Sequence, residues 1–150
     1  MKPSNSVNKM NIIKVDHDKQ LEDAYSVRQT VFIKEQNVPP DIELDEHDQT
    51  AVHFVGYNGD QPIAASRLRL VDDYGKLERI CVLKEERGKQ YGVQIIHHME
   101  SYLSEQGFKK SKLNAQKHAE DFYKKIGYKT ISGEFMDAGI PHVTMVKELS

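Results

Sequence analysis

A glycine-containing segment, Lys84–Gly92, separates an apolar run, Ile80–Val82, from an amphipathic stretch that begins at Tyr91. A loop that leads from a strand into a helix exposes consecutive backbone N–H groups at the positive end of the helix dipole, where phosphate and pyrophosphate bind readily. Gly88 and Gly92 would let the main chain approach such a ligand without an intervening Cβ. The segment therefore predicts an anion-binding loop, although a plain strand-to-helix turn that uses glycines would show the same pattern.

Two familiar nucleotide-binding motifs are excluded by the sequence. The chain contains no Gly-Lys-Ser/Thr run, so the segment is not a Walker loop. It also lacks the three spaced glycines of the dinucleotide-binding fingerprint, which requires a βαβ unit at the start of the domain. A phosphate held here would be recognised by another type of loop.

Cysteine and histidine offer little further chemistry. Cys81 is the single cysteine, which excludes an intramolecular disulfide and a zinc site with several thiolates, and its apolar neighbours predict a buried side chain. His97 and His98 are adjacent, so they leave a helix in different directions, and the chain has no HExxH motif. We expect no bound metal.

The elements that position the segment follow from hydrophobic periodicity. The sequence predicts a helix over 91–105 with Gly107 just beyond its end. Before Lys84–Gly92, runs in which apolar and polar residues alternate are joined by turn residues such as Asn58-Gly59, which predicts an antiparallel three-stranded meander. Strands and a helix alternate after it, which indicates one mixed α+β sheet. The expected strands are 10–15, 51–57, 62–71, 77–83, 112–116, 128–131 and 142–146, and the other expected helices are one capped by Asp18 and one over 119–126.

Charge is distributed unevenly along the chain. Residues 41–48 carry five acidic residues and no lysine or arginine, whereas residues 107–130 carry seven lysines against Glu120 and Asp121. Because Pro39 and Pro40 oppose a helix, the acidic segment is expected to be an irregular, solvated loop. A second interpretation places this loop beside a cationic acceptor and the lysines beside ligand phosphates. A nucleic-acid role for the lysines would require steeply salt-dependent binding.

Length and composition limit the class of protein. The 150 residues suit a single domain, here 1–150, of which we expect residues 1–9 to be flexible. Charged residues are 29% of the chain, yet 21 basic and 23 acidic side chains nearly cancel, for a net charge of -2. No run approaches the ~18 apolar residues of a membrane span, and the N-terminus lacks the apolar segment of a signal peptide. A membrane protein, a collagen-like fibre and a strongly basic nucleic-acid coat are excluded, and we expect a soluble, cytoplasmic protein.

The segment that ends at Gly92 resembles the acetyl-CoA motif of the GNAT N-acetyltransferase superfamily, Arg/Gln-x-x-Gly-x-Gly/Ala after a strand that ends in valine. Val82, Arg87 and Gly92 match this pattern, and Gln90 replaces the middle glycine. Because backbone N–H groups bind the pyrophosphate, a side chain that points away is tolerable. A positive φ at Gln90 would nevertheless be strained.

Three further segments extend the resemblance over residues 10–149. The stretch from Asn114 to Tyr128 is similar to the superfamily's second motif, in which a strand is followed by Phe-Tyr-x-x-x-Gly-Phe/Tyr. Arg28–Gln36 and Phe135–Met145 resemble the bacterial ElaA/YjcF-like branch. Four motifs in the right order are more specific than one. The resemblance implies an α+β fold with a GNAT-like mixed, mainly antiparallel twisted sheet, flanking helices and a splay between the fourth and fifth strands.

The resemblance also implies the roles of individual residues. The main chain of the fourth strand would hold the pantetheine, and the Val82 N–H would point at the thioester oxygen as an oxyanion donor. Arg28, Glu35 and Gln36 would line the acceptor side, without an assigned chemical role. The residues expected to bind acetyl-CoA are Ile80, Cys81, Val82, Arg87, Gly88, Lys89, Gln90, Tyr91, Gly92, Asn114, Phe122 and Tyr123.

Two residues are candidates for proton transfer. Tyr123 is expected to be the general acid, because a phenol stays protonated at neutral pH and can serve a departing thiolate; otherwise it is an aromatic on a buried helix face. Glu78 is expected to take the amine proton, because it shares strand parity with Ile80 and Val82 and so leaves the strand on a defined face. A surface carboxylate paired with a lysine or arginine is the alternative for Glu78, and water could also be the base.

Together these features predict an acetyl-CoA-dependent N-acetyltransferase that moves an acetyl group to a primary amine of a small molecule by direct attack in a ternary complex. The alternatives are an acyltransferase similar to acyl-homoserine-lactone synthases and a non-catalytic acyl-CoA-binding module. The expected partners are acetyl-CoA and a small amine, with neither nucleic acid nor membrane, and a homodimer is a reasonable default.

Overall fold

A computed structural model describes residues 9–149 of the chain, so the flexibility expected of residues 1–9 falls, apart from Lys9, outside the described residues. One mixed sheet runs through the molecule in the order β1-β2-β3-β4-β5-β8-β6, with β7 paired to β8. Neighbouring strands are antiparallel except for β4 and β5, which are parallel. The α+β class and the meander β2-β3-β4 are therefore confirmed. The strands are β1 Asn11–Lys14, β2 Val52–Asn58, β3 Gln61–Val71, β4 Tyr74–Val82, β5 Lys110–Gln116, β6 Lys129–Thr130, β7 Phe135–Asp137 and β8 Ile140–Glu148.

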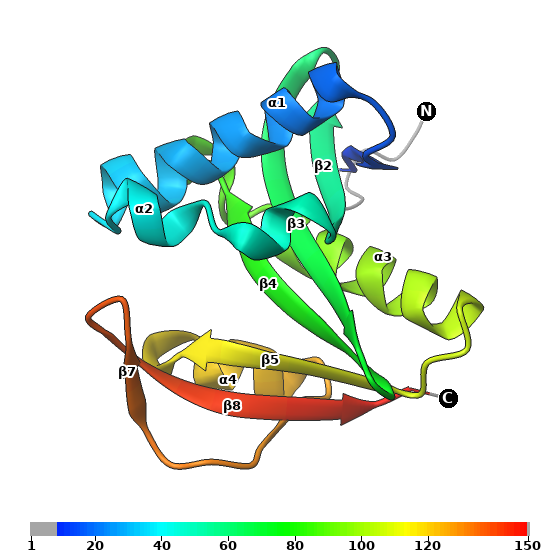
Figure 1. Ribbon diagram of the computed structural model, residues 1–150, viewed down its shortest axis with the longest axis vertical. Coiled ribbons are helices and arrows are strands. Elements are labelled where there is room, and N and C mark those ends of the chain that lie inside the picture. The colour runs from blue at the N-terminus through cyan, green and yellow to red at the C-terminus, as the bar shows by residue number, and fades with distance from the viewer. Residues whose placement is uncertain (1–8, 150) are drawn as a thin grey trace.

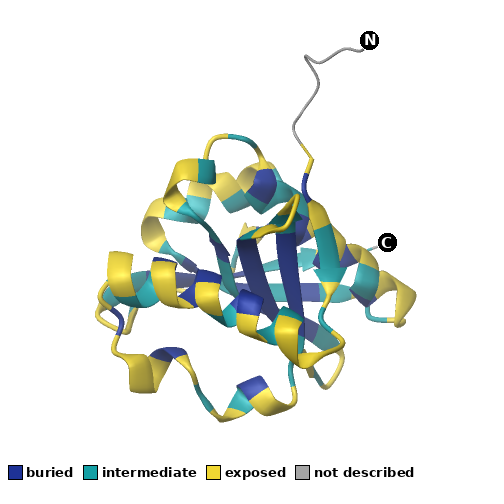
Figure 2. Ribbon diagram, turned by 90° about the horizontal axis from the view of Figure 1, so that it is seen from above, coloured by how far each residue is buried: buried dark blue, intermediate teal, exposed yellow. Residues whose placement is uncertain are grey.

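Helices cover both faces of the sheet (Figure 1). On one face, Ala24, Val27 and Val31 pack against the sheet residues Val55, Ala65 and Cys81. On the other face, the α3 residues Ile95, Ile96, Met99 and Leu103 belong to a larger core with Phe54, Leu68 and Leu77. Buried strands accordingly lie between helices whose outer sides are exposed (Figure 2). The helical segments are α1 Asp18–Arg28, its π-helical continuation η1 Gln29–Glu35, α2 Pro40–Glu43, η2 Glu46–Gln49, η3 Lys84–Glu86, α3 Tyr91–Glu105, η4 Lys117–Ala119 and α4 Glu120–Lys125.

The helix predicted over 91–105 is found with the same bounds, and Gly107 has the positive φ of a residue that follows a helix. Two details of the other helices were predicted wrongly. Asp18 is the first residue of α1 rather than its cap, which is His17. Pro40 does not exclude a helix but begins α2, because the first helical position needs no N–H donor. None of the helices within residues 9–149 is long and apolar enough to cross a lipid bilayer.

The sheet opens between β4 and β5, as expected for the fourth and fifth strands. Their pairing is confined to Gly75–Leu77 against Ser111–Leu113, and beyond these residues the two strands diverge (Figure 1). The α2 segment and the β7–β8 hairpin lie at the open end of this wedge (Figure 1). The opening leaves one edge of β4 without a neighbouring strand, which gives the molecule a site between the halves of its sheet.

A bulge at Arg79 lies at the start of the open half of β4. Arg79 has a φ of 57°, and the register against β3 shifts between the pairs Arg67↔Glu78 and Ala65↔Cys81. One extra residue reverses the alternation of side chains. Leu77 therefore packs on the α3 side of the sheet, whereas Cys81 packs on the α1 side.

Candidate active site

Two cavities occupy the wedge between β4 and β5. The first, called here the wedge cavity, has a volume of about 260 Å³ and lies between β4, β5, the η1–α2 segment and the β7–β8 hairpin. The second, called the loop cavity, has a volume of about 560 Å³ and lies against Arg87–Gly92 and the first turn of α3. The two cavities share four lining residues, Gln36, Ile80, Ala119 and Tyr123. Molecules bound in the two cavities would therefore meet at these residues.

The loop cavity is bordered by unpaired backbone donors. The first N–H groups of α3 have no partner within the helix, and among residues 9–149 the side chain of the N-cap residue Gln90 makes no capping hydrogen bond. Gly88 and Gln90 both have positive φ, of 82° and 66°, which turns the chain sharply into α3. The strain anticipated for Gln90, where the related motif has glycine, is thus present in the structure.

The open edge of β4 supplies a second row of backbone groups. Leu83 donates its N–H to Ile63 of β3 at 2.9 Å, and Cys81 lies opposite Ala65. Because main-chain groups of a strand alternate in direction, those of Ile80 and Val82 point toward the opening. The Val82 carbonyl already accepts a hydrogen bond from Arg87 Nε at 3.0 Å, so its N–H is the group available to a ligand.

Arg87 and Lys89, the two cationic side chains among the expected cofactor residues, are engaged by carboxylates. Arg87 donates from Nη1 and Nη2 to the two carboxylate oxygens of Glu35, both at 2.7 Å, and so ties the loop to η1. Lys89 lies 3.2 Å from Glu86 and does not line the loop cavity. Among the cofactor residues expected from the sequence, these two side chains serve the local structure in this conformation.

Three other predicted cofactor residues contribute little side-chain surface to the loop cavity. Burial raises the pKa of the Cys81 thiol to about 12, so it is not a thiolate nucleophile at neutral pH. Tyr91 packs its ring into the α3 core and offers only its main chain. Asn114 lines the wedge cavity instead and accepts a hydrogen bond from Thr144 Oγ1 at 2.8 Å. Phe122, in contrast, is 40% exposed and lines the loop cavity beside Gly92.

Tyr123 of α4 lies at the junction of the two cavities. Its ring makes edge contacts with Phe122 and Tyr128, with centroids 5.1 Å and 5.9 Å away. Within residues 9–149 its hydroxyl has no hydrogen-bond partner, so the fold does not use this group. Burial raises the pKa of Tyr123 to about 12, which keeps the phenol protonated at neutral pH.

Glu78 lines the wedge cavity. The prediction that its side chain shares a face of β4 with those of Ile80 and Val82 was wrong, because the bulge at Arg79 places Glu78 and Ile80 on opposite faces. Its carboxylate accepts hydrogen bonds from Arg67 at 2.6 and 3.0 Å and also faces Arg69 and Lys76. Burial acts to raise the pKa of Glu78, but the charge of Arg67 outweighs it and holds the pKa below its usual range. Such a carboxylate accepts a proton less readily than a free one.

The acidic segment 41–48 is not a solvated loop. Arg28, which is fully buried, donates to Glu43 Oε2 and to Asp48 Oδ1, both at 2.7 Å. Arg67 donates to Asp45 Oδ1 at 2.7 Å. These pairs form a buried ionic network that fixes α2 and η2 on the sheet as one wall of the wedge cavity. Arg28, which was expected to line the acceptor side, therefore supports the wall of the wedge cavity without lining the cavity, whereas Gln36 lines it.

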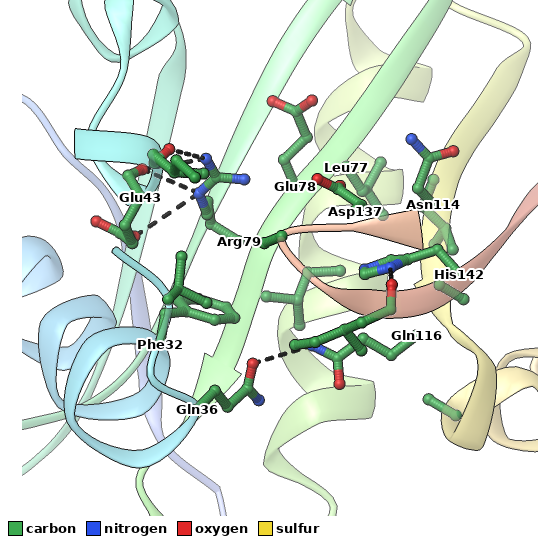
Figure 3. A pocket seen from close by; sticks show the side chains of 18 of the residues that line it. Phe32, Gln36, Glu43, Leu77, Glu78, Arg79, Asn114, Gln116, Asp137 and His142 are labelled. Carbon is green, nitrogen blue, oxygen red and sulfur yellow. Dashed lines mark hydrogen bonds and ion pairs between the residues drawn. The ribbon is translucent and has the colours of Figure 1, made fainter. Parts of the chain in front are cut away.

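Several side chains of the wedge cavity were not singled out from the sequence (Figure 3). Gln116 donates from Nε2 to Gln36 Oε1 at 3.0 Å and so bridges the opening from β5 to the end of η1. Phe32 forms part of the η1 wall, and Asp137 and His142 enter from the β7–β8 hairpin (Figure 3). The motif Phe135–Met145 was the available signal, but β7 has only three residues, too few for a periodicity to reveal the hairpin. Within residues 9–149, no three His, Cys, Asp or Glu side chains gather as metal ligands.

Comparison with known proteins agrees with this geometry. Residues 14–149 match the family model of the acetyltransferase (GNAT) domain. The uncharacterized N-acetyltransferase YjcF of Bacillus subtilis is 46% identical over 140 residues, which cover 93% of this chain and all of YjcF.

ElaA of Escherichia coli is 30% identical over 135 residues, 87% of this chain and 88% of ElaA. Its crystal structure superposes with a TM-score of 0.84 over 94% of this chain and all of that chain, at 25% identity. A GNAT family acetyltransferase from Elizabethkingia anophelis, solved with acetyl-CoA bound, shares the fold at 11% identity, with a TM-score of 0.74 over 95% of this chain and 99% of that chain. With its open sheet, its two adjoining cavities and these relatives, the chain belongs to the GNAT acetyltransferase superfamily, in the ElaA/YjcF-like branch.

Proposed function

We propose that this acetyltransferase moves an acetyl group from acetyl-CoA to a primary amine of a small molecule, by direct attack in a ternary complex. The observation that carries the proposal is the junction of the two cavities at Ile80 and Tyr123. A donor in the loop cavity and an acceptor in the wedge cavity would meet there, and no covalent intermediate on the protein is needed. Holding both reactants in one site removes much of the entropic barrier of a bimolecular reaction.

Acetyl-CoA suits the loop cavity and the open edge of β4. The uncapped N–H groups at the start of α3 would hold the pyrophosphate, as helix N-termini commonly do. The main chain of Ile80 at the open edge of β4 would pair with an amide of pantetheine, as a neighbouring strand would. When bound, acetyl-CoA supplies the activated thioester. The acetyl-CoA carried by the Elizabethkingia anophelis protein, which has the same fold, supports this choice of donor.

Two groups of the chain would act on the thioester. The Val82 N–H would donate to the thioester oxygen and stabilise the negative charge that develops there. Tyr123 would give its proton to the departing sulfur, because its phenol is protonated and unused by the fold. Glu78 remains a candidate proton acceptor, although its three cationic neighbours favour a role in holding Arg67 and the cavity wall.

Release of free CoA from acetyl-CoA in the presence of phenethylamine, tyramine, cadaverine and spermidine tests the proposal. We expect amine-dependent CoA release with at least one of these, together with the acetylated product by mass spectrometry. Saturable acetyl-CoA binding without turnover would favour a non-catalytic binding module. A strong preference for long acyl-CoAs would favour an activity like that of acyl-homoserine-lactone synthases.

The variant Tyr123→Phe tests the general acid. We expect kcat to fall by about 10²-fold, because proton transfer by a positioned group contributes ~10²–10⁴-fold. Tyr102→Phe is the matched control, since Tyr102 lies on α3 and contacts the Phe54 ring. Full turnover of Tyr123→Phe would refute the assignment of this residue.

A further inference from the structure

We infer that His142 is the group that takes the proton from the acceptor amine, through its Nε2 atom in the wedge cavity. This inference rests on the proposed acetyl transfer and adds a catalytic residue to it. His142 belongs to the β7–β8 hairpin, in which Phe135 pairs with His142 and Asp137 with Ile140. Of these residues, Asp137, Ile140 and His142 line the wedge cavity. Figure 3 shows the imidazole reaching into the cavity from this hairpin.

The hydrogen bonding of His142 fixes which of its nitrogens is basic. Nδ1 lies 2.7 Å from the Ile140 carbonyl oxygen, and a carbonyl can only accept. The proton of the neutral ring is therefore on Nδ1, and the lone pair is on Nε2. The ring is held in place by stacking on Phe135, with centroids 6.0 Å apart and planes 26° apart. Within residues 9–149, Nε2 has no hydrogen-bond partner, although His142 as a whole is only 8% exposed.

Most of the other titratable side chains of the cavity are already committed to partners. The charged and titratable side chains that line the same cavity are Lys76, Glu78 and Arg79 of β4, Glu43 of α2, Asp137 of β7 and Tyr123 of α4. Glu43 and Glu78 are each paired with arginine, and Arg79 donates to the Glu43 carbonyl and to Asp45. Lys76 is a cation that faces Glu78. Tyr123 serves as the acid in the proposed reaction.

Of the three carboxylates that line the cavity, Glu43 and Glu78 are paired, whereas Asp137 has no salt bridge to another described residue and is exposed. A carboxylate at this position would favour an ammonium group near the hairpin. It would thereby help to bring the amine of the substrate beside Nε2. The acceptor would thus be a primary amine whose carbon chain contacts Phe32, Ile42 and Leu77 of the cavity wall.

The proton transfers balance as follows. Nε2 of His142 accepts one proton from the substrate ammonium, which leaves a neutral amine. The amine nitrogen forms its bond to the acetyl carbon while the carbon–sulfur bond breaks, and Tyr123 gives its proton to the sulfur. The second amine proton restores the Tyr123 phenol, and His142 releases its proton to solvent. The net products are the amide, CoA thiol and one proton.

The variant His142→Asn tests the inference, because the asparagine amide can still donate to the Ile140 carbonyl but provides no base. With acetyl-CoA and the best amine of the panel, we expect kcat/KM to fall about 10²-fold at pH 7.5. The pH profile of kcat/KM for the wild-type protein should contain an acidic limb, and the variant, which has no base at this position, should lack it. His17→Asn is the control, since His17 lies at the exposed start of α1 and asparagine is a good cap there.

Retention of the acidic limb and of activity in His142→Asn would overturn the inference. Imidazole ¹⁵N shifts of the wild-type protein, with His142 assigned by comparison with the variant, give a result that depends neither on turnover nor on the variant's activity. We expect a neutral ring with its proton on Nδ1, as the contact with the Ile140 carbonyl requires. A proton on Nε2 would refute the role of His142 even if acetyl transfer were confirmed, whereas a protein that acetylates no amine would refute the proposed function instead.

Discussion

Arg28, which supports a wall of the wedge cavity, and Arg87, which lines the loop cavity, make nearly the same contacts in very different surroundings. Each donates two hydrogen bonds of 2.7 Å to carboxylate oxygens, Arg28 to Glu43 and Asp48 and Arg87 to Glu35. The Arg28 side chain is fully buried, whereas that of Arg87 is 41% exposed. Geometry alone therefore does not tell which pair stabilises the fold.

The difference lies in what remains when one partner is removed. A buried carboxylate without its arginine has neither water nor a counter-charge, and breaking such a pair costs ~3–5 kcal/mol. An exposed carboxylate is simply hydrated, and exposed pairs contribute ~0–1 kcal/mol. The wall of the wedge cavity formed by α2 and η2 is accordingly fixed, whereas we expect the exposed Arg87–Glu35 contact to open when a ligand enters the loop cavity.

The first prediction compares Arg28→Met with Arg87→Met. We expect Arg28→Met to lower the free energy of unfolding by about 3–5 kcal/mol, because Glu43 and Asp48 lose their buried partner. Arg87→Met should change it by no more than about 1 kcal/mol. Urea denaturation followed by circular dichroism measures both. Equal losses of unfolding free energy in the two variants would contradict the distinction between the buried contacts of Arg28 and the exposed Arg87–Glu35 pair.

The second prediction concerns the pH dependence of the ionic network. Burial acts to raise the pKa of Asp48, but the hydrogen bond from Arg28 and the other contacts of the network outweigh it and hold the pKa below its usual range. The pKa of Asp45 is also lowered, with burial opposed by Arg67. A carboxylate whose pKa is lower in the folded state stabilises the fold above its unfolded pKa, near ~3.9, and loses this contribution as the pH falls toward the folded value.

We therefore expect the free energy of unfolding to fall progressively as the pH drops below about 4, as measured by urea denaturation in a series of buffers. Asp48→Asn should be less stable at pH 7 and should show a shallower decline. Glu35→Gln, which removes the exposed partner of Arg87, should keep the wild-type decline nearly unchanged. An unchanged slope in Asp48→Asn would show that the buried network is not the source of the acid sensitivity.

The ionic network also shows why part of the site could not be predicted from the sequence. The helix 91–105 could be predicted with its bounds, because its periodicity and Gly107 are local signals. Glu43, Asp45 and Asp48 could not be recognised as members of an ionic network, since their partners Arg28 and Arg67 are 15 to 22 residues away in the chain. Only the fold shows that these three acids of 41–48 help to form a wall of the wedge cavity, while Asp41 and Glu46 are exposed.

The bulge at Arg79 limited the prediction for Glu78 in a similar way. The sequence contains no sign that Arg79 has a positive φ. Strand parity counted from Ile80 and Val82 therefore assigned the Glu78 side chain to the wrong face of β4. The splay of the sheet, in contrast, was predicted from the family resemblance rather than from any residue pattern. His142 lay within a recognised motif, but its role depends on the contact with Ile140, which needs the hairpin that β7 forms.

The last and smallest predicted effect is that of Gln90→Gly in the loop. Gln90 adopts φ 66° and ψ 18°, and the left-handed region costs an ordinary residue ~1–2 kcal/mol. Glycine relieves this strain, but the unfolded chain then gains entropy worth ~0.4–1 kcal/mol. We therefore expect the variant to be more stable by about 0.5 kcal/mol, measured by urea denaturation.

Glu22→Gly, at an exposed helical position of α1, is the control and should instead destabilise the protein by about 0.5–1 kcal/mol. A loss of stability in Gln90→Gly as large as that in Glu22→Gly would show that the Gln90 side chain holds the loop. The loop that borders the loop cavity would then be fixed by specific side-chain contacts, as the wall formed by α2 and η2 is, and its strain at Gln90 would have to be offset by those contacts.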